Sequence, residues 1–148
     1  MYQRILVGTD GSPRALEAVR VAGNLAELTG ANTLHVVAAC QPFTSHEMAQ
    51  VQNDLPEEFH DLLSPYLQAH DRIEAAATML PASIKVIPHE LSGDAADGIL
   101  AVAEAVKADL IVVGARGLGA VERFVRGSVS TKIAHHSPCD VLIVEHDD

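Results

Sequence analysis

Two glycines three positions apart, followed later by a Gly-Ser pair, form the most informative pattern in this sequence. Gly114 and Gly117 come directly after the apolar run of residues 109–113, and nine residues then separate Gly117 from Gly127-Ser128 at the start of a helical stretch. Glycines let backbone N–H groups approach an anion, and a helix N-terminus adds the positive end of its dipole. The pattern predicts a phosphate-binding loop; the alternative is a structural loop whose glycines only permit tight turns.

A second polar turn that contains glycine follows the first apolar run. Asp10 opens the turn of residues 10–13, directly after the strand expected at residues 4–9. A carboxylate here can accept a hydrogen bond from a ribose hydroxyl, hold Mg²⁺ through water, or simply stabilise the turn. We favour a ligand role, because the carboxyl ends of strands in open α/β sheets face the ligand crevice.

Apolar strands and amphipathic helices alternate along the chain, which predicts a doubly wound parallel sheet with helices on both faces. Ser12 and Pro13 should begin the first helix, Gly30 should end it, and Pro88 makes the third strand an edge strand. We expect strands at residues 4–9, 33–39, 84–90, 109–113 and 140–145, helices at 13–29, 57–80 (with a break at 64–65), 95–107 and 128–136, and a loop or short helix at 41–56.

The two functional turns constrain the order of the strands. Ligands of open α/β sheets bind beyond the carboxyl ends of neighbouring strands, at the point where the strand order reverses. If one ligand uses both turns, the first and fourth strands are neighbours, which favours the order 3-2-1-4-5 over 2-1-3-4-5. The result is a Rossmann-like α/β fold in a single domain spanning residues 1–148.

Composition limits the classes of partner. The chain has 148 residues, 48% of them hydrophobic, and a net charge of −10, so we expect one globular domain that binds neither nucleic acid nor membrane. It shows no signal-peptide pattern and no apolar run of membrane-spanning length, so we expect a cytoplasmic protein. Arg116, Arg123 and Arg126 suit a small polyanion, while Cys40 and Cys139 should be reduced thiols.

With these motifs in place, the whole chain resembles the universal stress protein family. The matching segments are residues 5–12, 34–36, 108–117 and 137–144. The ATP-binding branch of that family carries G-x-x-G, nine residues and then G-S/T, which Gly114, Gly117, Gly127 and Ser128 fulfil. The resemblance therefore implies ATP as the cofactor, with Mg²⁺.

The resemblance also implies the roles of individual positions. Adenine and ribose would lie near Thr9, Asp10, Val36 and Val113. The phosphates would lie on the backbone of Gly114, Gly117, Gly127, Ser128 and Val129, near the hydroxyls of Ser128 and Ser130 and the guanidinium of Arg116. Members of the family usually form homodimers, here through the last strand, residues 141–145.

Several enzyme signatures are missing from the sequence. It contains no G-x-x-x-x-G-K-S/T, no G-x-S-x-G and no G-x-G-x-x-G after the first strand, and neither motif loop holds a lysine that could stabilise a transferred phosphoryl group. We therefore expect an ATP-binding stress-response regulator that changes loop, dimer or partner contacts. The alternatives are a slow ATPase or adenylyl-type hydrolase using Asp10, and a ligand-free dimeric scaffold. Residues 41–54 could form a lid over the ligand.

Overall fold

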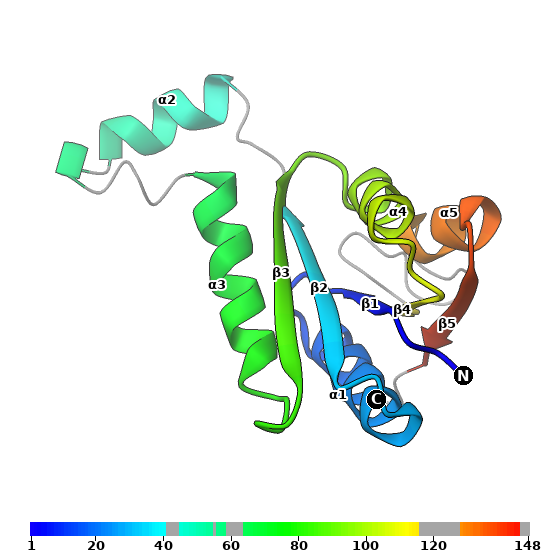
Figure 1. Cartoon of the computed structure of the whole chain (residues 1–148). Coiled ribbons are helices and arrows are strands. Elements are labelled where there is room, and N and C mark those ends of the chain that lie inside the picture. The colour runs from blue at the N-terminus through cyan, green and yellow to red at the C-terminus, as the bar shows by residue number, and fades with distance from the viewer. Residues whose placement is uncertain (41–44, 55, 59–63, 116–127, 146–148) are drawn as a thin grey trace.

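The computed structural model describes residues 1–40, 45–54, 56–58, 64–115 and 128–145. Its centre is a five-stranded, all-parallel sheet with the order β3-β2-β1-β4-β5, which confirms the predicted strand order and fold class (Figure 1). The strands are β1 (Ile5–Gly8), β2 (Thr33–Cys40), β3 (Lys85–Ser92), β4 (Leu110–Gly114) and β5 (Asp140–Val144). Both cysteines are free: Cys40 ends β2, and Cys139 directly precedes β5.

Helices cover both faces of the sheet, and each face has its own apolar core. Alanines and branched aliphatic side chains of α1 (Pro13–Thr29) and α3 (Pro65–Ala77) pack on one face. On the other face, α4 (Ala95–Val106) and α5 (Ser128–His136) cover the opposite side chains of β1 and β4. Figure 1 shows the remaining helix, α2 (Ser45–Asp54), standing off the sheet beyond the start of α3.

The helix ends follow the local signals in the sequence. The Ser12 hydroxyl accepts a hydrogen bond from the N–H of Ala15 at 3.2 Å, and Gly30 ends α1 with a left-handed φ of 76°. Asp94 caps α4 in the same way, accepting from the N–H of Asp97 at 2.9 Å. Within the predicted 57–80 helix, α3 begins at Pro65, the predicted restart, and ends at Ala77, whereas residues 59–63 lie outside the described residues. The 41–56 segment contains the short helix α2.

Two side-chain pairs that involve β3, His35 with His89 and His70 with Glu90, shift the pKa values of their histidines in opposite directions. His35 Nδ1 and His89 Nε2 lie 3.0 Å apart with stacked rings, and burial lowers the pKa of both, assisted at His35 by the neighbouring His89 and Arg4. His70 on α3 places its Nδ1 2.6 Å from the Glu90 carboxylate, and this hydrogen bond raises the pKa of His70.

These shifts predict opposite contributions to the pH dependence of stability. The His70 contribution is fully present below the unfolded pKa of about 6.5 and is lost as the pH rises through the higher folded pKa. The contribution of His35 and His89 is present above that value and is lost as the pH falls toward their lower folded pKa values.

We expect His70→Gln to cost more unfolding free energy at about pH 5 than at about pH 8. The double change His35→Gln/His89→Gln should instead flatten the acid side of the profile. Urea unfolding across this pH range checks both, and profiles parallel to wild type would contradict them.

Candidate functional site

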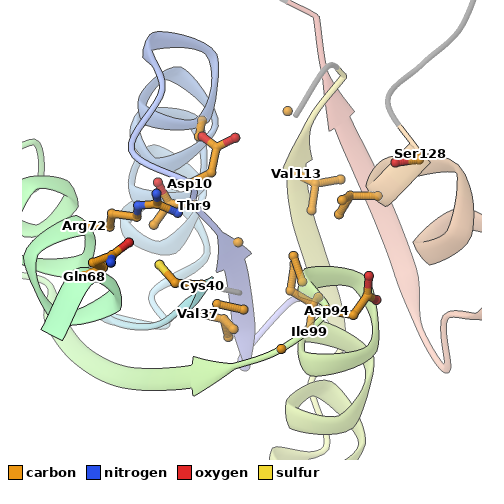
Figure 2. Close-up of a pocket in the computed structure, with 17 residues that line it drawn as sticks. Thr9, Asp10, Val37, Cys40, Gln68, Arg72, Asp94, Ile99, Val113 and Ser128 are labelled. Atoms are coloured by element: carbon orange, nitrogen blue, oxygen red, sulfur yellow. The ribbon is translucent and has the colours of Figure 1, made fainter. Parts of the chain in front are cut away.

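A cleft of about 380 Å³ lies at the carboxyl ends of β1, β2 and β4 (Figure 2). The helix that follows β1, α1, packs on one face of the sheet, whereas α4 and α5 pack on the other face. The neighbouring strands β1 and β4 therefore form the point at which the strand order reverses, where open α/β sheets bind ligands. Pockets for small ligands have volumes of about 300–1,000 Å³, so the cleft has a suitable size.

The cleft brings together residues from both turns singled out by the sequence. Six of the predicted site residues line it: Thr9, Asp10, Val113, Gly114, Ser128 and Val129. Ser128 and Val129 form the first turn of α5, so the N-terminus of that helix borders the cleft. The predicted site residues Arg116, Gly117 and Gly127 lie outside the described residues, as do Arg123 and Arg126.

The structure places the other two predicted site residues outside the lining of the cleft. Val36 is fully buried in the core beneath α1, and it is the next residue, Val37, that lines the cleft. Successive side chains of a strand point to opposite faces, so only one of these two valines can face α4. Ser130 is 1% exposed, and its hydroxyl donates to the carbonyl oxygen of Ala115 at 3.2 Å. Ser130 thereby joins α5 to the residue that follows β4.

Asp10 both shapes its turn and faces the cleft. Its Oδ1 accepts a hydrogen bond from the N–H of Ser12 at 2.8 Å, and the Thr9 hydroxyl accepts one from the N–H of Gly11 at 3.1 Å. Gly11 has a φ of 82°, a left-handed conformation that a residue with a side chain rarely adopts. The turn thus holds the Asp10 carboxylate at the edge of the cleft, so its part in the turn is compatible with a ligand role.

An ion pair connects the helices on the α5 side of the cleft. Lys132 Nζ lies 2.6 Å from Asp97 Oδ1 and 3.6 Å from Asp94 Oδ2, and the hydrogen bond to Asp97 raises the pKa of Lys132. Asp94 lines the cleft as well as capping α4. These groups are exposed, so the pair adds little to stability. The pair links the first turn of α4 to α5.

The family is decided by the extent of the sequence match. A profile described as "Usp: Universal stress protein family" matches residues 1–145. The chain belongs to the universal stress protein family. A curated relative from Thermus aquaticus, called "Universal stress protein in QAH/OAS sulfhydrylase 3'region", is 38% identical, with 97% of this chain and 99% of that protein covered.

Solved structures of universal stress proteins share the fold. A crystal structure of a universal stress protein in complex with cAMP is 34% identical, with a TM-score of 0.64 and 99% of each chain covered. The universal stress protein UspA from Lactobacillus plantarum is 25% identical, with a TM-score of 0.74 and 97% of each chain covered. Both similarities extend over essentially the whole of this universal stress protein.

The third wall of the cleft is α3, which the sequence did not predict. Gln68 and Arg72 line the cleft from this helix, next to Cys40 at the end of β2. Burial raises the pKa of the Cys40 thiol, and the nearby Arg72 charge partly opposes this effect. The available sequence signal for this wall was that Gln68 and Arg72 are polar and four residues apart in the helix that follows Ser64-Pro65. The sequence does not show that this face of the helix borders the Asp10 turn.

None of the helices in the described part of this universal stress protein is both long and apolar enough to cross a membrane.

Proposed function

We propose that this universal stress protein binds ATP, with Mg²⁺, in the cleft between β1 and β4 and acts as a nucleotide-dependent regulator. The observation that carries the proposal is the meeting of the Asp10 turn and the N-terminus of α5 at one cleft, at the reversal point of the sheet. The 34% identical relative in complex with cAMP supports an adenine nucleotide as the ligand.

The described residues suit the two ends of a nucleotide. Ser128 and Val129 offer backbone N–H groups, a hydroxyl and the helix dipole to the phosphates. Asp10 offers a carboxylate to a ribose hydroxyl or to a water bound to Mg²⁺. Hydrogen bonds to charged groups contribute about 1.5–3 kcal/mol each, so several of them can supply the roughly 8 kcal/mol of a micromolar complex.

We propose binding rather than rapid turnover. Neither motif loop holds a lysine that could stabilise a transferred phosphoryl group. Arg72, a described lining residue, belongs to α3 and lies away from Ser128 (Figure 2). We therefore assign the nucleotide a regulatory role, in which its phosphates contact the glycine motif of residues 114–128 and change dimer or partner contacts.

Calorimetric titration of dialysed, nucleotide-free protein with Mg·ATP tests this proposal. We expect saturable binding of one nucleotide per subunit, and its loss in Gly127→Val, which alters the glycine motif identified in the sequence. Release of ADP or AMP is measured in parallel, and Asp10→Ala distinguishes hydrolysis that depends on Asp10 from binding alone. A wild-type protein that shows no saturable binding up to millimolar Mg·ATP would overturn the proposal.

The proposal includes a homodimer formed through the last strand, residues 141–145. β5 is an edge strand of the sheet, and its Leu142 side chain is 36% exposed. The outer side of an edge strand presents unpaired N–H and C=O groups, which can pair with a second copy. An exposed leucine on such an edge adds apolar area for the contact.

We expect Leu142→Lys to shift the protein from dimer to monomer at micromolar concentration, because an edge lysine opposes strand pairing. Light scattering coupled to size exclusion measures the mass. The matched control is Leu28→Lys, the same change at a residue of α1 that is 78% exposed, and it should leave the mass unaltered. A Leu142→Lys dimer as stable as the wild-type dimer would place the interface elsewhere.

A further inference from the structure

The side chains around the cleft fall into two groups, at opposite ends. Figure 2 shows Val113, Ile99, Asp94 and Ser128 on the side of α4 and α5. On the other side, Gln68 and Arg72 of α3 lie near Thr9, Asp10 and Cys40. The proposed function places the phosphates at the N-terminus of α5. The α3 end of the cleft then faces the opposite end of the nucleotide.

The placement of α3 follows from its sequence. Pro65 begins the helix, and Ala69, Ile73 and Ala76 are buried against the sheet. Gln68 and Arg72 are four residues apart, so they lie on one face of the helix, one turn apart. They border the cleft because that face is turned toward the carboxyl ends of β1 and β2.

Arg72 is held against the turn that carries Asp10. A Cβ atom added to Gly11 would lie 3.3 Å from Arg72 Cγ, so the methylene stem of the arginine crosses directly over this glycine. Gly11 therefore serves two purposes, a left-handed φ and close packing of the arginine stem. The contact places the stem of Arg72 beside the Asp10 turn.

Both polar groups are available to a ligand. Within the described part of the chain, neither the Gln68 amide nor the Arg72 guanidinium makes a side-chain hydrogen bond or an ion pair, although both side chains are half-buried. Half-buried polar groups that line a cleft and lack a protein partner gain a hydrogen bond when a complementary ligand group arrives.

We propose that Gln68 and Arg72 form the base-recognition wall of the site, with the Gln68 amide reading the edge of adenine and the Arg72 guanidinium lying on the face of the base. The inference rests on the proposed function and adds base selectivity to it. An amide offers a donor beside an acceptor, which matches N6–H and N7 of adenine; guanine offers two acceptors, O6 and N7. A planar guanidinium stacks well on an aromatic face.

Calorimetry with four ligands tests the wall: ATP, GTP, adenosine and inorganic tripolyphosphate. Wild type should prefer ATP to GTP. Gln68→Leu should lose about tenfold or more in ATP affinity and most of that preference. Arg72→Met should lower the affinity for ATP and the affinity for adenosine by equal factors, and it should leave the affinity for tripolyphosphate unaltered. Asp71→Asn, an exposed neighbour on α3, is the matched control and should bind all four ligands like wild type.

Distinct results overturn the inference. A Gln68→Leu protein with the wild-type ratio of ATP to GTP affinity would remove the base-reading role. A loss in Arg72→Met that extends to tripolyphosphate would make Arg72 a phosphate ligand instead. Gln68→Glu, which keeps the side-chain size but loses the donors, repeats the first test if Gln68→Leu folds poorly. Failure of wild type to bind ATP at all would instead refute the proposed function, so the two failures are distinguishable.

Discussion

Ile111→Ala is expected to lower the free energy of unfolding by about 2–5 kcal/mol. Ile111 is fully buried on β4, between β1 and β5, and its side chain belongs to the core beneath α4 and α5. The change removes methyl and methylene groups from a close-packed interior and leaves a cavity that the surrounding strands cannot fill. A loss of this size is a large part of the total stability of a domain, which is about 5–15 kcal/mol.

Urea unfolding at neutral pH measures the effect, with Leu28→Ala on α1 as the control. Leu28 is 78% exposed, so its truncation should cost clearly less than that of Ile111. Ile111 does not line the cleft, so saturating Mg·ATP should raise the unfolding free energy of Ile111→Ala by the same amount as that of wild type. Equal losses in the two variants would contradict the assignment of Ile111 to the core.

The strand order was predictable because the positions of two turns added information to the hydrophobic pattern. Periodicity alone locates five strands, but the assumption that the Asp10 turn and the Gly114 motif serve one ligand places β1 beside β4, as the structure does. Local signals were equally informative at helix ends. Ser12, Gly30 and Asp94 each have side-chain or backbone properties that determine a cap without help from tertiary contacts.

Side-chain direction in the buried strand β2 was not predictable from the sequence. Residues 36–39 are all apolar, because both faces of a central parallel strand are covered by helices. Such a run carries no alternation that tells which residues face the cleft. The structure therefore had to show that Val37, rather than Val36, contributes a side chain there.

The α3 wall was hidden for a different reason. Gln68 and Arg72 are polar residues of an ordinary amphipathic helix, and only packing places them beside the Asp10 turn. The same holds for Gly8 on β1. In the sequence this glycine merely precedes the polar turn, whereas in the structure it allows a close approach between β1 and Ile99 of α4.

That close approach leads to the second effect, a loss of about 1 kcal/mol of unfolding free energy in Gly8→Ala, at the low end of the range for overpacking because the atom that must move is the end of the Ile99 side chain. A Cβ atom at this position would lie 2.5 Å from Ile99 Cδ1 and 3.3 Å from Ile99 Cγ1. Both residues line the cleft, so the displaced isoleucine should also weaken nucleotide binding. Urea unfolding and calorimetry measure the two effects.

Ile99→Val tests the cause of this loss, because valine lacks the Cδ1 atom that the new methyl group would meet. In the Ile99→Val background, Gly8→Ala should cost little, since the remaining contact at 3.3 Å needs only a small shift. Gly30→Ala is the control: its φ of 76° makes alanine unfavourable there, with no atom within 4 Å of the added Cβ, so Ile99→Val should not rescue it. Additive losses for Gly8→Ala and Ile99→Val would show that the two side chains do not compete for space. A selective rescue would mean that the absence of a side chain at Gly8 lets Ile99 form one wall of the cleft.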